Sequence, residues 1–248
     1  MIKRNKIQEH SEIIHNLYKE LYPNANNILC PSITFQVTDD CCCNCSYCYQ
    51  GNKNKHYMTP ETAIQIVDYL FDLYEKNDIN NLINKNTAGI ILEFIGGEPL
   101  MNIDAIDAAC THFLNYCLIH NHPWLRTFRI SMISNGKYYF DSKVQDFLKR
   151  FHNFISFGIT LDGPEDIHNK CRKYFDGTGN FKDAFAALKY HNQHYNQIRT
   201  TKVTIAPENL LEINKLIDFF INEAGATDIF MNPVFEAEWT NEEASIYY

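Results

Sequence analysis

The 248-residue sequence contains no run of about 18 apolar residues, the length that a helix needs to cross a bilayer. Its first residues, MIKRNKIQEHSE, also lack the apolar stretch of a signal peptide. Positive charge is scarce, since 22 Lys and Arg stand against 30 Asp and Glu and the formal net charge is −8. These features argue against a membrane-spanning protein and against a nucleic-acid partner, whose phosphates attract a basic surface. We expect a cytoplasmic protein.

Cysteine, by contrast, is abundant and unevenly distributed. The chain has nine cysteines, an odd number that does not suit a closed set of disulfides. Five of them fall within eight residues, at Cys41, Cys42, Cys43, Cys45 and Cys48. In a reducing compartment such a cluster is typical of metal ligands. Cys110 and Cys117 instead lie on the apolar stripe of a predicted helix, which favours small buried side chains.

Apolar runs and helical periodicities alternate along most of the chain. Strands are predicted over 32–38, 89–97, 128–136, 154–163, 201–207 and 228–235. Helices are predicted over 5–21, from Pro60 onward after the N-cap Thr59, and over 103–119, 141–152, 180–195 and 209–223. Several strands are near-continuous apolar runs, as expected for parallel strands covered on both faces. This rhythm indicates right-handed βαβ units.

The repeated units predict an α/β fold, a partial (β/α)6 TIM-like barrel with parallel strands and a preceding N-terminal helix. A doubly wound open sheet is the alternative. Both architectures place functional groups at the C-terminal ends of the strands. We divide the chain into an N-terminal helical extension, 1–31, and a core barrel, 32–248. Thr240 and Glu243 predict a capping box for a last helix, yet the chain stops at Tyr248, so we expect a further C-terminal region.

The cysteine cluster follows the first predicted strand directly and reads VTDDCCCNCSYCYQ. Cys41, Cys45 and Cys48 have the spacing C-x3-C-x2-C, and three thiolates on one loop can hold three irons of a [4Fe–4S] cluster. The fourth iron would stay open, as a catalytic metal centre requires. The amino and carboxylate groups of S-adenosyl-L-methionine suit that open position.

Two other metal interpretations stay open. Cys42, Cys45 and Cys48 have the C-x2-C-x2-C spacing of a ferredoxin, but the x3-C-P continuation is missing. A structural zinc would need a fourth ligand, for which His56 is the nearby candidate. Either would make the chain a non-catalytic electron carrier or metal-binding module. With C-x3-C-x2-C as the ligand set, Cys42 and Cys43 are expected to be non-ligand neighbours.

The cysteine motif and three later segments together resemble the radical S-adenosylmethionine superfamily. The cysteine spacing, with Tyr47 before the last cysteine, is similar to the cluster motif of that family. The segment GGEP, residues 96–99, resembles its glycine-rich motif. The segments Ser134-Asn135-Gly136 and LDGPEDIHNKCR (161–172) are similar to the peptide- and protein-modifying branch. That branch includes sulfatase-maturing enzymes and SPASM-type, thioether-forming peptide maturases.

The resemblance implies a [4Fe–4S] cluster held by Cys41, Cys45 and Cys48, with S-adenosyl-L-methionine beside it. It implies that the methionyl amino group meets the segment Gly96, Gly97, Glu98 and Pro99. It places Tyr47 against the adenine, and Ser134 and Asn135 near the ribose or the carboxylate.

Asp162 lies at the end of the fourth predicted strand. His168 and Arg172 follow it four residues apart, so they would lie on the same face of a helix. The guanidinium of Arg172 matches the methionyl carboxylate as a two-pronged donor. A surface ion pair with Asp166 or Glu165 would also explain Arg172. His168 is open between support of the site and ordinary capping.

The resemblance also implies a reaction. A one-electron reductant such as flavodoxin or ferredoxin would drive reductive cleavage of S-adenosyl-L-methionine to methionine and a 5′-deoxyadenosyl radical. That radical would abstract hydrogen from a peptide or protein substrate. Peptide maturation and formylglycine formation in a sulfatase both stay open, as does a member that binds the cofactor without turnover.

Overall fold

The computed structural model describes residues 30–51, 53–195, 200–226 and 228–247. The helix predicted over 5–21, and with it nearly all of the extension 1–31, lies outside the described residues. Six strands form one sheet: β1 (Ser32–Thr38), β2 (Ile90–Gly96), β3 (Phe128–Ser134), β4 (Ile155–Thr160), β5 (Thr200–Ile205) and β6 (Asp228–Pro233).

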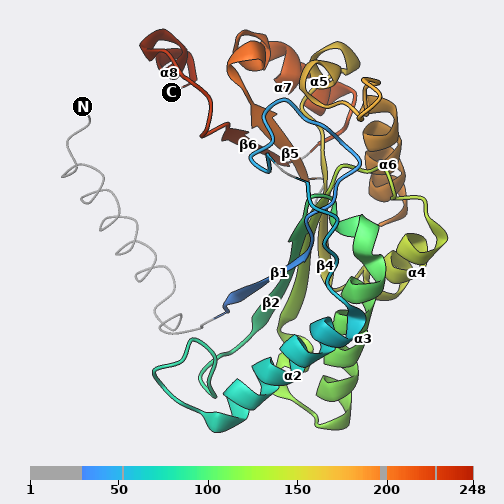
Figure 1. Cartoon of the computed structure of the whole chain (residues 1–248), viewed down its shortest axis with the longest axis vertical. Helices are drawn as coiled ribbons and strands as arrows, with labels where there is room; N and C mark the ends of the chain where they lie inside the picture. The colour runs from blue at the N-terminus through green and yellow to red at the C-terminus, as the bar shows by residue number, and fades with distance from the viewer. Residues whose placement is uncertain (1–29, 52, 196–199, 227, 248) are drawn as a thin grey trace.

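The strands lie in the sheet in the same order as in the sequence, β1 to β6, and every neighbouring pair is parallel. A doubly wound sheet would reverse its order at a switch point, so this order identifies the partial TIM-like barrel. Figure 1 shows the sheet curved, with helices α2, α3, α4 and α6 on its outer side. The predicted fold is confirmed.

Most helices connect successive strands and lie near the predicted positions, whereas the short helix over 165–171 was not predicted. The helices are α2 (Pro60–Lys76), α3 (Ile103–Ile119), α4 (Ser142–Phe151), α5 (Glu165–Cys171), α6 (Phe181–His194), α7 (Ile213–Asn222) and α8 (Asn241–Tyr247). Three 3₁₀ turns accompany them, η1 (Pro99–Asn102), η2 (Pro123–Arg126) and η3 (Pro207–Glu212). Among the described helices, none is long and apolar enough to cross a membrane.

Both predicted helix starts are formed by the side chains that predicted them. The Thr59 hydroxyl accepts a hydrogen bond from the backbone N–H of Thr62 at 3.1 Å, and Pro60 opens α2. At the start of α8, Glu243 accepts from Thr240 N at 2.8 Å, and Glu243 N donates to the Thr240 hydroxyl at 3.2 Å. This is the reciprocal pair of a capping box.

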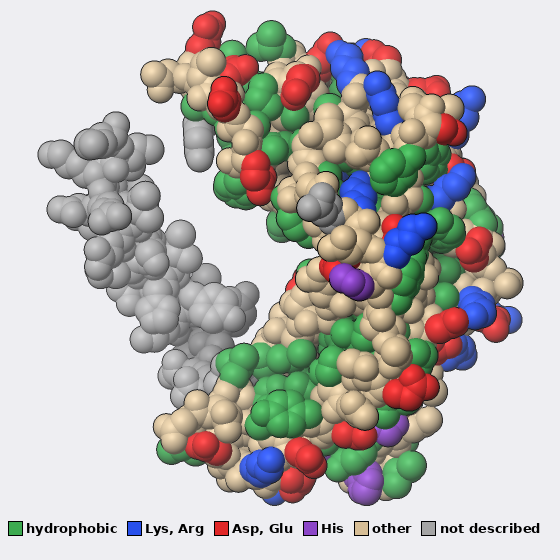
Figure 2. Space-filling model, viewed as in Figure 1, with side chains coloured by type: hydrophobic (Ala, Val, Ile, Leu, Met, Phe, Trp, Pro, Cys, Tyr) green, Lys and Arg blue, Asp and Glu red, His purple; other side chains and the backbone are tan. Residues whose placement is uncertain are grey.

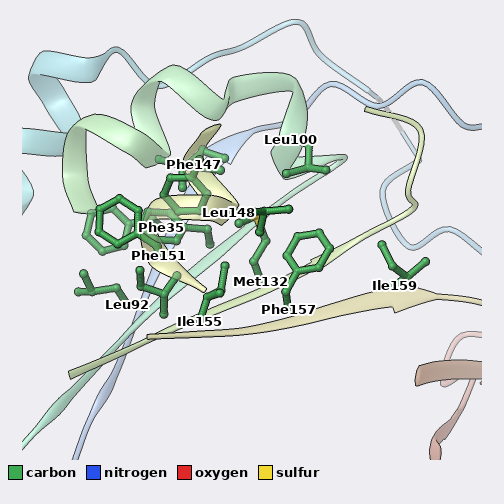
Figure 3. Packing of buried hydrophobic residues seen from close by; sticks show 14 of the residues in the cluster. Phe35, Leu92, Leu100, Met132, Phe147, Leu148, Phe151, Ile155, Phe157 and Ile159 are labelled. Carbon is green, nitrogen blue, oxygen red and sulfur yellow. The ribbon is translucent and has the colours of Figure 1, made fainter. Parts of the chain in front are cut away.

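Residues of the sheet form alternating rows across the strands. One row is apolar and buried beneath the helices: Phe35, Phe94, Met132 and Phe157 are paired neighbours with at most 6% of their surface exposed. Phe147, Leu148 and Phe151 of α4 belong to the same core (Figure 3). Burial of each such side chain stabilises the fold by about 1.5–3 kcal/mol, so this layer holds the strands in register.

The adjacent row is polar and lies on the inner, concave face. It consists of Thr34, Glu93, Ser131 and Ser156, which are paired neighbours and only partly buried or exposed. The expectation that the strands are covered on both faces is therefore wrong for the described part of the chain. The sequence does not reveal this open face, because each strand segment looks mostly apolar. Its inner-face positions are single polar residues that stand between large apolar ones.

Candidate functional site

A cavity of about 500 Å³ opens at the C-terminal ends of the strands. All the site residues predicted from the sequence, except Asp162, line this one cavity. Of the described lining residues, Cys41, Cys43, Cys45 and Cys48 offer thiol sulfur. Thiolates are the protein ligands of iron–sulfur clusters, so the donor chemistry of the cavity fits such a cluster.

The cysteine loop, residues 40–49, leaves β1 through an irregularity in the pairing with β2, between Gln36 and Thr38. Two backbone hydrogen bonds then fix its base to the segment after β2. Gly97 N donates to Thr38 O at 3.0 Å, and Glu98 N donates to Asp40 O at 2.9 Å. The GGEP segment therefore fixes the start of the cysteine loop, just before Cys41.

The two glycines of GGEP are required by this packing. A Cβ atom on Gly97 would lie 2.3 Å from Asp40 O, and one on Gly96 would lie 2.7 Å from Thr38 O. Both neighbours are backbone atoms and cannot rotate away. The sequence interpretation assigned these glycines to close approach of a ligand, and the structure shows that they first allow close approach of the cysteine loop.

The chain returns beside β1 after the loop. Asp39 N donates to His56 O at 3.1 Å, and Met58 N donates to Val37 O at 2.8 Å. The His56 ring faces Asp39 at 3.4 Å, has 78% of its side chain exposed, and does not line the cavity. His56 is thus badly placed as a fourth zinc ligand.

A second attachment joins the loop to the end of α5. Asn44 N donates to Lys173 O at 2.7 Å, and Ser46 N donates to Cys171 O at 3.0 Å. Cys43 also forms an antiparallel bridge with Tyr174. The loop and the segment carrying Arg172 are therefore one hydrogen-bonded unit.

The sulfurs of Cys41, Cys42 and Cys43 lie within 4.8 Å of one another. Hydrogen bonds from Cys42 and Cys43 lower the pKa of Cys41 and so favour its ionised form. The structure thus draws Cys41 together with its two sequence neighbours, while Cys45 and Cys48 line the cavity outside that group. The ligand set Cys41, Cys45 and Cys48 stays a prediction.

Asn135 lies against the same sulfurs. Its Nδ2 lies 3.3 Å from the Cys42 sulfur, 3.4 Å from that of Cys43 and 3.8 Å from that of Cys41. An amide N–H directed at sulfur stabilises negative charge there. Asn135 therefore faces the cysteines, rather than standing free at the end of β3.

Arg172 approaches the loop from the other side. Its Nη1 lies 3.8 Å from the Cys45 sulfur, and its guanidinium lies 5.4 Å from the centre of the Tyr47 ring. A hydrogen bond from Cys43 and the charge of Arg172 lower the pKa of Cys45 to about 7, against the effect of burial. These contacts favour the ionised form of Cys45.

Asp162 is fully buried and orients Arg172. Its Oδ2 accepts from Arg172 Nε at 2.8 Å and from the Tyr47 hydroxyl, and its Oδ1 accepts from Thr204 N at 3.0 Å. With these partners Asp162 is committed to protein contacts and does not line the cavity. The alternative ion pair of Arg172 with Asp166 or Glu165 is wrong, because Arg172 pairs with Asp162, while Lys215 pairs with Asp166 at 2.6 Å.

His168 lies in a directed chain of hydrogen bonds. Its Nδ1 accepts from Asp162 N at 3.0 Å, so its proton resides on Nε2, which donates to Asn180 Oδ1 at 3.0 Å. Asn180 Nδ2 then donates to Asn135 O at 3.0 Å. Burial lowers the pKa of His168 to about 4, so the ring is neutral at physiological pH. His168 supports the ends of two strands.

Glu98 joins the ends of β2 and β3. One carboxylate oxygen accepts from the Ser134 hydroxyl at 2.7 Å and from Leu100 N at 3.1 Å, and the other accepts from Asn135 N at 2.7 Å. Burial raises the pKa of Glu98 to about 7. Ser134 and Glu98 therefore bind each other, an arrangement that the sequence interpretation, which gave each of them to the cofactor, did not foresee.

Sequence reasoning missed three residues near the site. Lys53 donates from its Nζ to Cys43 O, Asn180 supports Asn135, and Lys202 lines the cavity from β5. Lys202 carried a signal, because a charge in the middle of the strand segment TTKVTI is unusual in a parallel sheet covered on both faces. The other two gave none.

No family model matches the chain. It is 28% identical over 189 residues to an uncharacterized protein of Methanocaldococcus jannaschii, covering 76% of this chain and 58% of that protein. It is 23% identical over 229 residues to the radical SAM cyclopropyl synthase TigE of Paramaledivibacter caminithermalis, covering 86% of this chain and 44% of the synthase. The chain spans about half the length of the curated relatives it matches.

The match to TigE extends over the cysteine loop, the GGEP segment and the strand ends described above, whose motifs resemble the same superfamily. The chain therefore resembles the radical S-adenosylmethionine superfamily both in its motifs and in its likeness to TigE. A solved structure, native anSMEcpe with bound AdoMet and Kp18Cys peptide, shares the fold with a TM-score of 0.66 at 17% identity. The likeness covers 87% of this chain and 57% of anSMEcpe.

Proposed function

We propose that this chain is the catalytic core of an enzyme that binds a [4Fe–4S] cluster and S-adenosyl-L-methionine and abstracts hydrogen from a peptide or protein. The observation that carries the proposal is the shared cavity. The cysteine loop, the GGEP segment, the end of β3 and Arg172 line one space at the C-terminal ends of the strands.

When bound, the cluster and S-adenosyl-L-methionine supply a one-electron reductive cleavage that yields methionine and a 5′-deoxyadenosyl radical. The residues of this chain hold these groups and shield them. Cys41, Cys45 and Cys48 would be the cluster ligands, since all three line the cavity in the C-x3-C-x2-C spacing. Cys42 does not line it, which favours Cys41 over the ferredoxin spacing.

Arg172 is the candidate for the methionyl carboxylate. Its Nε is occupied by Asp162, which leaves the Nη groups directed to the cavity side, next to Cys45. A guanidinium held on one edge presents its remaining donors without loss of side-chain freedom. Tyr47, under the guanidinium, and the residues Ser134 and Asn135 would complete the cofactor site.

The peptide-modifying role rests on the relatives. TigE is named a cyclopropyl synthase, and anSMEcpe has been solved with bound AdoMet and a peptide. A peptide substrate, a one-electron reductant such as flavodoxin or ferredoxin, and a cytoplasmic location are parts of this proposal. The trough described in the next subsection offers room for such a substrate.

The proposal is tested on anaerobically reconstituted protein given dithionite and S-adenosyl-L-methionine. The wild type should form 5′-deoxyadenosine, and Cys45→Ala should form none above the level of cluster-free protein. Cys30→Ala is the matched control, because Cys30 is exposed and lies outside the cavity, and it should behave as the wild type does.

The same samples separate the rival functions. If the wild type binds iron that can be reduced and reoxidised but forms no 5′-deoxyadenosine, the result would contradict the proposed enzymatic activity. It would favour an electron carrier. Stoichiometric zinc with no iron would favour a structural metal site. Loss of iron in Cys42→Ser as complete as in Cys45→Ala would contradict the proposed ligand set.

A further inference from the structure

A trough runs from the cysteine loop along the inner face of the sheet. A second hollow of about 790 Å³ shares Glu93, Ser131, Ile133, Lys202 and Asn232 with the cavity at the strand ends. The two hollows therefore adjoin each other. Figure 2 shows the molecule hollowed on the side toward which the sheet curves.

Lys202 lies where the two hollows meet. It is a half-buried residue near the middle of β5. Its paired neighbours are Thr160 on β4 and Phe230 on β6, and neither carries a charge. Within the described residues, the Lys202 ammonium has no ion pair and no side-chain hydrogen bond.

The other Lys and Arg side chains that line the trough have partners. Arg172 pairs with Asp162 at 2.8 Å, Lys53 donates to Cys43 O, and Arg129 donates to Phe128 O at 2.7 Å. The Glu93 carboxylate accepts from the Thr34 hydroxyl at 2.7 Å. Lys202 is thus the uncompensated cation among these groups of the described trough.

An uncompensated cation in a hollow has a physical cost and a use. A partly buried ammonium group loses part of its favourable hydration free energy. A nearby carboxylate offsets this cost, because the attraction between opposite charges is stronger where water is excluded. Lys202 lies on the inner face of the sheet, and its cross-strand neighbours are uncharged. A bound ligand with an anionic group would therefore supply the partner that the protein does not. The whole chain is acidic at −8, so this local positive charge runs against the composition.

We propose that Lys202 binds a carboxylate of the peptide substrate and so selects peptides that carry one at a fixed place. The inference rests on the proposed function. The carboxylate belongs either to an Asp or Glu side chain or to the C-terminus of the peptide. Lys202 is a specificity residue in this account, because it reads the substrate at a distance from the cysteine loop.

The test is affinity selection from two synthetic libraries of random octapeptides, one with free C-terminal acids and one with C-terminal amides. The bait is the full chain, anaerobically reconstituted, with S-adenosyl-L-methionine present. Wild type, Lys202→Gln and Lys202→Glu are compared by mass spectrometry of the retained peptides. Lys182→Glu is the matched control, since it makes the same charge change at an exposed position of α6.

Wild type and Lys182→Glu should enrich peptides carrying a carboxylate, Lys202→Gln should lose that enrichment, and Lys202→Glu should enrich Lys or Arg instead. Enrichment in the amide library assigns the carboxylate to a side chain, and enrichment confined to the free acids assigns it to the C-terminus. The inversion of charge preference is a readout that a merely structural lysine would not give.

Equal enrichment by wild type and Lys202→Glu overturns the inference, as does a wild type that retains no acidic peptides. Formation of 5′-deoxyadenosine without peptide is measured separately. If 5′-deoxyadenosine forms but Lys202→Glu leaves the peptide preference unchanged, the carboxylate site fails and the proposed function stands. If acidic peptides bind through Lys202 without any cleavage, the proposed function fails alone.

Discussion

At the scale of single residues, the pair of Asp162 and Arg172 should contribute strongly to stability. The side chain of Asp162 is fully buried and that of Arg172 is 12% exposed. Removing one charge therefore leaves the other buried without a partner. We expect Asp162→Asn to lower the free energy of unfolding by about 3 kcal/mol. Asp166→Asn is the matched control, because its pair with Lys215 is 62% and 50% exposed and should change stability by less than about 1 kcal/mol. Urea unfolding measures both, and equal losses would contradict the assignment.

His168 should make stability depend on pH. Its pKa is about 4 in the folded protein and 6.5 as the reference value, so between these pH values the unfolded chain binds more protons. The contribution of the neutral His168 ring to the free energy of unfolding is fully present above pH 6.5. It decreases by about 3 kcal/mol in total as the pH falls toward 4.

The measurement is urea unfolding of wild type and His168→Gln at several pH values between 4 and 7.5. The variant should be less stable at pH 7.5, and the gap should narrow as the pH falls, because only the wild type loses this contribution. A gap that stays constant across this range would refute a neutral His168.

At the scale of elements, the cysteine loop depends on the glycines that it packs against. We expect Gly97→Ala to displace the loop, since the new methyl group would meet Asp40 O at 2.3 Å. Iron bound after reconstitution should fall well below that of the wild type. Gly51→Ala lies just beyond the loop with nothing within 4 Å of the new Cβ, and it should load iron normally. Normal loading by Gly97→Ala would show that the loop tolerates a shifted base.

The elements themselves were largely predictable because their signals are local. Thr59 with Pro60 predicts the start of α2, and Thr240 with Glu243 predicts the start of α8, within a few neighbouring residues. The predicted helix over 209–223 was wrong in its first turn, which is the 3₁₀ turn η3. There Asn209 accepts from Ala206 N and donates to Thr204 O, and these bonds compete with an α-helical start.

The internal bonds of the site could not be predicted in this way. The bond from Ser134 to Glu98 spans 36 residues, and the contact of Tyr47 with Asp162 spans 115. The motifs indicated that these residues belong to one site, and in the structure all but Asp162 line one cavity. Which of them bind one another depends on the register of neighbouring strands, which a single sequence does not reveal.

At the scale of the whole molecule, the described part of the sheet has its shortest pairing between β4 and β5. In the described part of the chain these strands pair at Ile159 with Thr201 and at Thr160 with Lys202, whereas β3 and β4 pair over five positions. Fewer paired residues permit opening at lower free energy. In hydrogen exchange measured by mass spectrometry, β5 and β6 should therefore exchange together and faster than β2 and β3. Uniform protection of all six strands would contradict this expectation.

The attachment of the cysteine loop to residues 171–174 has a consequence during synthesis. Cys45 and Arg172 are 127 residues apart, so the loop leaves the ribosome long before its partner segment. At typical rates of elongation the delay is roughly 6 to 25 seconds. Throughout that interval five neighbouring thiols are without the segment that later packs against them. The nascent chain is therefore most vulnerable to oxygen before the second half of the barrel exists.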